Sequence, residues 1–176
     1  TGGWGSNGIF LAAATTASDV TVSNNFIWDV ASQGFNGVDQ ADNGYGIVVA
    51  SGGGYKIYDN SVNLNTNQVA ATGITAGLNV LAAVTTVGSI DLRDNIFSSV
   101  QTVGTRYGVL SSAPSTVFSS IDTNDYFAQN VGFIGGNAKA SLSAWQAATG
   151  QDASSIAANP QFVSATDLHI ASPGFS

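Results

Sequence analysis

The chain has 176 residues but no cysteine, no methionine and no glutamate, and charged residues make up only 9% of it. The absence of cysteine excludes disulfide bonds and thiolate metal sites. Only four residues are Lys or Arg, whereas eleven are Asp, which gives a net charge of −7 at neutral pH. Nucleic acids and anionic membrane surfaces are bound through clustered Lys and Arg, so we expect neither as a partner.

Long apolar segments are also missing. No stretch approaches the ~20 consecutive apolar residues that a membrane-spanning helix needs, so we expect no membrane insertion. The sequence starts at Thr1-Gly-Gly-Trp4 and shows no signal-peptide pattern. Because it also lacks Met, we expect it to be a piece of a longer protein.

Residues that normally build the exposed faces of helices are scarce. Glu is absent and Lys and Arg are few, and their place is taken by Ser, Thr, Asn, Gly and Asp, which are poor helix formers. These residues favour short strands that are joined by tight turns. The composition therefore predicts an all-β protein.

One sequence phrase recurs and places an asparagine between two short alternating segments. It occupies residues 20–27, 55–62 and 90–97, with a degenerate fourth copy at 119–126. In the first three copies the residues five and three positions before the asparagine are apolar, and in all four the residue two positions after it is apolar. This alternation predicts strands with one buried and one wet face. The asparagines of the four copies are Asn25, Asn60, Asn95 and Asn124.

The spacing of these asparagines favours a solenoid. A unit of ~30–35 residues with three short strands cannot bury its own apolar side, whereas stacked units share one interior and pair their strands in parallel. We therefore predict about four to five stacked coils, with the four asparagines in one column and each asparagine in the left-handed conformation that turns the chain. An antiparallel sandwich is the main alternative, but it does not predict a phrase that recurs at equal spacing.

A second phrase, Gly followed by an aliphatic residue, lies between the asparagine phrases. We take its copies as a second recurring element of the repeat. They are Gly8-Ile9, Gly46-Ile47, Gly73-Ile74 and Gly108-Val109.

The C-terminal part carries a distinct pattern. Ser141 can cap a short helix over residues 142–149 that ends at Gly150, and Pro160 prevents its continuation. Trp145, Gly150, Asp152 and Ser155 then precede Asn159-Pro160-Gln-Phe162 and Asp167-Leu-His169-Ile-Ala-Ser172-Pro173.

These repeats and this closing pattern resemble bacterial right-handed parallel β-helix repeat proteins of the pectin-lyase-like superfamily. Many of those proteins close with Trp-x-x-x-x-Gly-x-Asp-x-x-Ser, Asp-Pro-x-Phe and Asp-x-His-Leu-x-x-x-Ser-Pro. This chain has Asn159 for the first Asp of the second motif and Ile170 for the Leu of the third, and one residue instead of three separates Ile170 from Ser172. The resemblance implies a single right-handed parallel β-helix domain over residues 1–176, with a closing segment at 141–176 that includes the short helix. It also implies that His169 is structural.

Charged residues align on the outer face of the predicted solenoid. Lys56 is expected to lie beside Asp91 in one column, and Arg93 beside Asp122 in the next, about 4.8 Å apart. Such residues can form a polysaccharide site, but we favour two cross-strand ion pairs, because a lyase needs several cations that face one cleft. The columns are Thr21, Lys56, Asp91 and Ser120, and Ser23, Tyr58, Arg93 and Asp122.

Two further groups of residues are candidates for ligand binding. Asn24, Asp59 and Asp94 offer oxygens to calcium, but two neighbouring carboxylates are few for such a site, so solvated turn positions are the preferred interpretation. Trp28 follows the inward residue Ile27 in the same predicted strand, so its side chain is expected on the outer face. This exposed aromatic residue is the candidate carbohydrate contact. We expect no catalytic residue, no metal and no cofactor.

The resemblance implies a non-catalytic structural or adhesive β-helix unit of a bacterial cell-surface or secreted protein, located outside the cell. Its partners are then polysaccharide or neighbouring β-helix units. Two alternatives stay open: a β-helix that binds or degrades polysaccharide, with lyase-like or glycoside hydrolase-like activity, and a subunit of a self-assembling extracellular filament.

Overall fold

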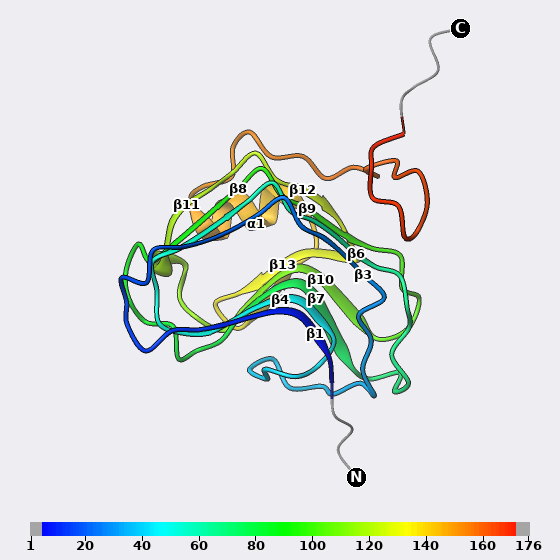
Figure 1. Cartoon of the computed structure of the whole chain (residues 1–176), viewed down its shortest axis with the longest axis horizontal. Coiled ribbons are helices and arrows are strands. Elements are labelled where there is room, and N and C mark those ends of the chain that lie inside the picture. Colours follow the sequence, from blue (N-terminus) through cyan, green and yellow to red (C-terminus); the bar gives the residue numbers. More distant parts are fainter. Residues whose placement is uncertain (1–4, 172–176) are drawn as a thin grey trace, which may run out of the picture.

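The computed structural model describes residues 5–171, so the end of the closing pattern at Ser172-Pro173 lies outside the described residues. It confirms the predicted all-β parallel solenoid with one short helix near the C-terminus. Three sheets surround a common interior, and the helix α1 (Leu142–Thr149) lies behind the last coil in the view of Figure 1.

The chain passes four times through sheets A, B and C in this order, with one strand in each sheet, and two further strands belong to sheet A. Sheet A contains β1 (Asn7–Ala12), β4 (Tyr45–Ser51), β7 (Ile74–Val80), β10 (Thr105–Ser111), β13 (Asn130–Ile134) and the antiparallel β14 (Asn137–Lys139). Sheet B contains β2 (Val20–Ser23), β5 (Tyr55–Tyr58), β8 (Ile90–Arg93) and β11 (Phe118–Asp122). Sheet C contains β3 (Phe26–Trp28), β6 (Ser61–Leu64), β9 (Ile96–Ser99) and β12 (Asp125–Phe127), and a short 3-10 turn, η1 (Ser115–Val117), precedes β11.

The strands of sheets B and C pair in parallel and in the predicted register. Val22 lies beside Ile57, which lies beside Leu92. In Figure 1 the chain passes clockwise from β1 to β2 and β3 and recedes from the viewer with each turn, which makes the solenoid right-handed. This is the hand that connections between parallel strands adopt almost without exception.

The predicted number of coils was too high. The four strands of sheet C are separated by three full turns of the chain, from Asn25 to Asn124, so the structure has about three turns where four to five coils were predicted. The difference arises at the C-terminal side, where β13 is followed by the antiparallel β14 and then by α1 instead of by another coil.

The interior is filled by the inward residues of all three sheets. Sheet C supplies Ile27, Val62, Phe97 and Tyr126, and Tyr55 of sheet B is buried as predicted. Aromatic rings continue along the axis, since Phe97 stacks on Tyr126 and Tyr126 contacts Trp145 of α1.

Glycines of sheet A face these bulky residues, and they explain the second sequence phrase. A Cβ atom on Gly77 would lie 2.7 Å from the Phe97 ring and 2.9 Å from the carbonyl oxygen of Gly108. Because Tyr107 and Val109 pair with Ala76 and Leu78, the third copy of the phrase is Gly77-Leu78. The assignment of Gly73-Ile74 to this position was wrong, because sequence alone cannot tell which of two nearby glycines faces the ring.

The turn between sheets B and C also differs from the prediction. In each turn the left-handed residue is the one that directly precedes the recurring asparagine, with φ between 55° and 60°. The side chain of the asparagine forms hydrogen bonds between coils, and the residue before it adopts the left-handed conformation that turns the chain. Short polar side chains tolerate this conformation, which accounts for the identity of most of these residues. They are Asn24, Asp59, Asp94 and Thr123.

The predicted helix is confirmed with its caps. The Ser141 hydroxyl accepts a hydrogen bond from the Ala144 amide at 3.3 Å, and Gly150 ends the helix with a φ of 71°. Trp145 is fully buried, and its ring lies against Gly132 of β13. The helix therefore covers the C-terminal end of the interior.

The close approach of Gly77 to Phe97 predicts the outcome of a small substitution. Gly77→Ala should lower the free energy of unfolding by about 2–3 kcal/mol, because the added methyl group meets a ring and a backbone carbonyl that cannot both move away. Gly136→Ala is the control, since its site is open and only its φ of 77° opposes the change. Chemical denaturation measures both, and equal losses for the two variants would contradict this account of the phrase.

Candidate functional site: the asparagine ladder and the charged face of sheet B

The four asparagines form a hydrogen-bonded ladder that runs along the solenoid axis. The Asn25 Nδ2 atom donates to Asn60 Oδ1 at 2.9 Å, Asn60 Nδ2 donates to Asn95 Oδ1 at 3.0 Å, and Asn95 Nδ2 donates to Asn124 Oδ1 at 3.0 Å. Each of the first three backbone N–H groups donates to the same Oδ1 atom of the next coil. The Oδ1 atoms of Asn60, Asn95 and Asn124 thus each accept two hydrogen bonds from the preceding asparagine, so all donors of the ladder point towards the C-terminal coil.

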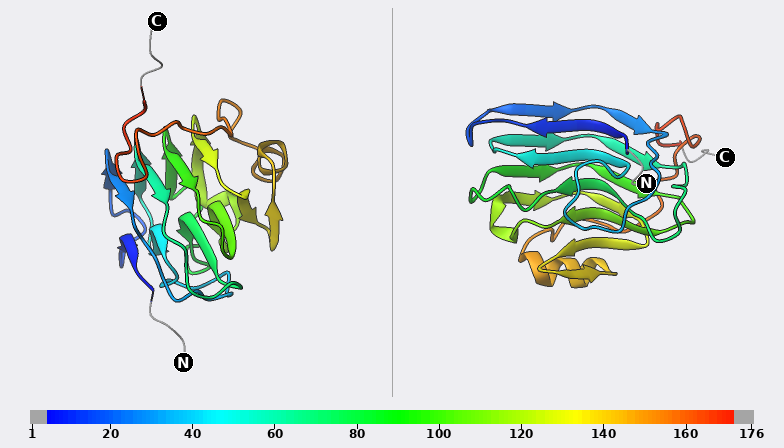
Figure 2. Two further views of the ribbon diagram at one scale, coloured as in Figure 1. Left: turned by 90° about the vertical axis from the view of Figure 1, so that its right-hand side faces the viewer. Right: turned by 90° about the horizontal axis from the view of Figure 1, so that it is seen from below.

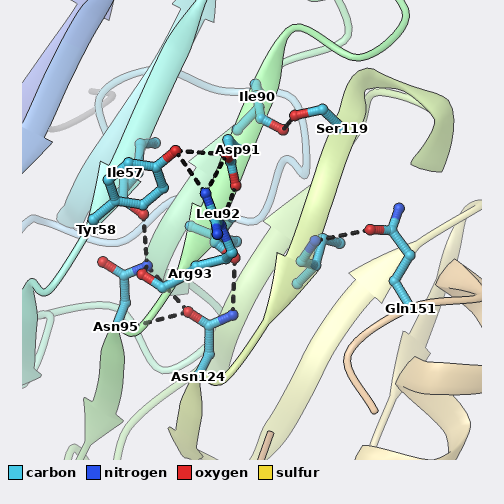
Figure 3. A network of polar contacts seen from close by, with 11 residues as sticks. Ile57, Tyr58, Ile90, Asp91, Leu92, Arg93, Asn95, Ser119, Asn124 and Gln151 are labelled. Carbon is cyan, nitrogen blue, oxygen red and sulfur yellow. Dashed lines mark hydrogen bonds and ion pairs between the residues drawn. The ribbon is translucent and has the colours of Figure 1, made fainter. Parts of the chain in front are cut away.

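The side-chain amides also hold the strands on either side. The Asn95 Nδ2 atom donates to the carbonyl oxygens of Arg93 in its own coil and Ile57 in the preceding coil, at 2.8 and 2.9 Å. Asn60 makes the equivalent bonds to Tyr58 and Val22. Since each inner asparagine is buried, these bonds satisfy groups that water cannot reach. Figure 3 shows the part of the ladder at Asn95 and Asn124.

The closing segment ends this ladder. The Asn124 backbone N–H donates to Ser155 Oγ at 2.8 Å, in the place of a further asparagine oxygen, and the Ser155 hydroxyl donates to Asp152. Asp152, which is 1% exposed, also accepts from Tyr126 Oη and Trp145 Nε1, each at 2.6 Å. Trp145, Asp152 and Ser155 belong to the closing pattern, but their sequence spacing did not reveal that they terminate the ladder.

Tyr126 remains a donor in this network. Burial raises the pKa of the Tyr126 phenol well above its usual value, and the neighbouring Asp152 carboxylate raises it further. The ladder therefore ends on a carboxylate that is surrounded by three side-chain donors.

The charged columns on sheet B have the predicted register, because Lys56 pairs with Asp91 and Arg93 with Asp122 in the strand ladder. The predicted ion pairs were nevertheless wrong. Lys56 Nζ lies 2.7 Å from Asp19 Oδ1, and Asp122 accepts the backbone N–H of Ser154 at 2.7 Å. The turns that carry Asp19 and Ser154 bring closer partners than the adjacent strand does.

Arg93 forms a compact network with Tyr58 and Asp91, shown in Figure 3. Its Nε and Nη2 atoms donate to the two Asp91 carboxylate oxygens at 2.7 and 2.8 Å, and its guanidinium lies 5.0 Å above the Tyr58 ring centre. The Tyr58 hydroxyl donates to Asp91 Oδ2 at 2.5 Å. Burial would raise the pKa of Asp91, but hydrogen bonds from Arg93 and Tyr58 and the nearby positive charges outweigh it and hold that pKa below its usual value.

Trp28 lies on the outer face of β3 and is 40% exposed, next to Phe26 at 41%. Both residues line a shallow hollow of about 270 Å³. The His169 ring packs edge-on against Phe26 with ring centres 5.0 Å apart, and His169 Nδ1 lies 2.6 Å from Asp167 Oδ1. This hydrogen bond from His169 lowers the pKa of Asp167.

His169 belongs to the segment of residues 156–171 that crosses sheet C, here called the strap, which is visible in orange to red in the left view of Figure 2. After α1 the chain pairs at Ile156 with Asp125 of the last coil. It then accepts a hydrogen bond from Asn63 at the Ala165 carbonyl, and it reaches the first coil at Phe26. The strap thus ties successive coils together from outside.

Between residues 5 and 171, no three His, Cys, Asp or Glu residues gather into a potential metal site. Within the same range no helix is long and apolar enough to cross a membrane. The candidate calcium ligands Asn24, Asp59 and Asp94 are left-handed residues of the turns between sheets B and C.

Comparison of the chain with protein-family models, with curated proteins and with solved structures gives no match.

The ladder predicts a graded response to removal of its members. Asn95→Ala removes the Oδ1 atom that accepts from the Asn60 backbone N–H and Nδ2, and it removes the Nδ2 donor to the Ile57 carbonyl oxygen. The free energy of unfolding should therefore fall by about 3 kcal/mol. Asn25→Ala should cost only about 1 kcal/mol, because Asn25 is the first member and no ladder asparagine donates to it. Denaturant unfolding of both variants tests this order, which equal costs would refute.

The Asp91 network predicts a pH dependence. A lowered folded-state pKa means that the ionised carboxylate stabilises the fold above the unfolded-state value of about 4, and that this contribution disappears as the pH falls through the folded value. The gap in unfolding midpoint between the natural chain and Asp91→Asn should therefore be largest at neutral pH and close by about pH 2. A gap that stays constant over this range would show that the carboxylate charge is unimportant.

Proposed function

We propose that the chain is a non-catalytic structural or adhesive solenoid unit of a bacterial cell-surface or secreted protein, of the pectin-lyase-like β-helix type that its repeats and closing pattern resemble. The observation that carries this proposal is the asparagine ladder, which joins every turn from Asn25 to Asn124 and ends on the Ser155–Asp152 network. Such an arrangement gives a stiff rod with one covered end.

The physical basis is the local nature of solenoid contacts. Each coil rests on its neighbours, so stiffness comes from repeated hydrogen bonds and not from a central site. The outer columns of sheet B and the first-coil aromatics Phe26 and Trp28 can then vary or bind without disturbing the interior.

The state of the outer carboxylates also favours a non-catalytic role. A glycoside hydrolase needs a carboxyl group with a raised pKa as its proton donor, opposite a second carboxylate. The pKa values of Asp19 and Asp91 are instead lowered by their basic partners. Burial raises the pKa of Asp125, but this carboxylate accepts the backbone N–H of Ala158 at 3.0 Å and serves to hold the strap.

The covered end bears on the filament alternative. A head-to-tail filament requires the C-terminal end of one chain to pair with the first coil of the next. Here α1 and the antiparallel β14 cover that end, and Trp145 of α1 is buried against Gly132 of β13. Open-ended stacking would therefore have to displace the helix, which favours a discrete unit.

Incubation with a panel of acidic and neutral polysaccharides tests the non-catalytic assignment. The chain should release no new reducing ends and no unsaturated sugar products, because Lys56 and Arg93 on sheet B are engaged with Asp19 and Asp91. The double variant Asp19→Asn/Asp91→Asn is the matched control. Depolymerisation by the natural chain that disappears in this variant would overturn the proposal.

A further inference from the structure

Three asparagine–glycine steps occur in this chain, and the structure holds each of them in a different environment. They are Asn7-Gly8, Asn36-Gly37 and Asn43-Gly44. In such a step the backbone nitrogen of the glycine can attack the side-chain amide carbon of the asparagine, because glycine has no side chain to obstruct the approach. This reaction is one reason why asparagine is thermolabile in proteins. Its rate at each step depends on how freely that part of the chain moves.

The step at Asn43 is held by hydrogen bonds on both ends of the side-chain amide. Asn43 is 1% exposed, and its Oδ1 atom accepts from the Phe35 N–H at 2.7 Å and from the Ser32 hydroxyl at 3.2 Å. Its Nδ2 atom donates to the carbonyl oxygens of Phe35 and Ile74, each at 2.7 Å. The amide carbon of Asn43 is therefore fixed in place and shielded from water.

The step at Asn7 is held by a strand. Asn7 and Gly8 belong to β1, which pairs in parallel with β4. The Asn7 Nδ2 atom donates to the Ala41 carbonyl oxygen at 2.6 Å, and its Oδ1 atom accepts from the Tyr45 N–H at 3.4 Å. In a strand successive groups point to opposite faces, so the paired backbone holds the glycine nitrogen away from the asparagine side chain.

The step at Asn36 has neither kind of restraint. It lies in the loop of residues 34–44, here called the outer loop, which follows the outer side of sheet A and is drawn in light blue below that sheet in Figure 1. Asn36 is exposed and belongs to no helix or strand. Within residues 5–171 no hydrogen bond holds its side chain or the Gly37 N–H. The two reacting groups are thus free to approach each other.

We propose that Asn36 is a site of spontaneous deamidation, at which the folded chain modifies itself. A bond forms between the Gly37 nitrogen and the Asn36 Cγ atom, the bond from Cγ to Nδ2 breaks, and ammonia leaves with the proton of the Gly37 N–H. Water then opens the resulting cyclic imide at one of its two carbonyl carbons. The product at position 36 is aspartate or isoaspartate, and water is the only other reactant.

The modification acts on a loop that is anchored to distant coils. The Ser112 hydroxyl donates to the Val38 carbonyl oxygen at 2.7 Å, and the Ala82 N–H donates to Asp39 Oδ1 at 2.9 Å. Val38 packs against the apolar cluster on the outer side of sheet A. Both products add a negative charge to a loop that already carries Asp39, and isoaspartate also adds a carbon atom to the main chain. Deamidation of Asn36 therefore loosens these anchors.

Incubation of the folded chain in mildly alkaline buffer, followed by peptide mapping with mass spectrometry, tests this site. Asn36 should lose its amide first, and Asn7 and Asn43 should react about ten-fold more slowly or less, because their reaction requires a local opening. In denaturant all three steps should react at similar rates, which separates the effect of the fold from that of the dipeptide.

Gly37→Ala is the matched variant, since a Cβ atom at this position would meet the flexible Gln40 side chain at 2.8 Å and no backbone atom. It should keep the unfolding midpoint and slow the reaction at Asn36 several-fold. In the modified fraction of the natural chain, hydrogen exchange at the Ala82 amide should be faster, and exchange at the Asn95 amide should be unchanged.

Equal rates at the three steps in the folded chain, or an unreacted Asn36, would refute the assignment of the site. The same holds for a rate that Gly37→Ala leaves unaltered. Unchanged exchange at Ala82 after complete reaction would refute the effect on the anchors of the outer loop.

Discussion

The buried asparagine column is the interaction on which the rest of this structure depends. Parallel strands need a reproducible turn between sheets B and C, and the ladder fixes that turn at the same height in every coil through side-chain and backbone donors to one oxygen. Because each inner asparagine bonds to its own coil and to its neighbour, a shift of register would leave several buried polar groups without partners.

Three other features follow from that fixed register. Inward residues of sheet C stack along the axis, and the glycines of sheet A leave room for their rings. The outer columns of sheet B bring charged and hydroxyl groups into lines along the axis. Finally, the closing segment supplies the Ser155 hydroxyl as the acceptor for the Asn124 backbone N–H, and the buried Asp152 carboxylate accepts from Ser155 in turn. The last backbone donor of the ladder is therefore hydrogen-bonded.

The sequence allowed the parallel solenoid, the stacked asparagines and the capped helix to be predicted, because each depends on local pattern and spacing. It did not identify the left-handed residue, since Asn24 and Asn25 are equally suited to that conformation. Nor did it pair Lys56 with Asp19, or Asp152 with Trp145 and Tyr126, because those contacts depend on how turns and the closing segment fold back.

The most direct test of the central role of the ladder is native-state hydrogen exchange at the backbone amides of Asn60, Asn95 and Asn124. These amides lie in turns, which usually exchange through small local openings. If the ladder holds the coils together, all three should exchange only through global unfolding, with the same free energy as the amides of β8. Exchange at the rate of exposed turn amides, while β8 stays protected, would contradict the account.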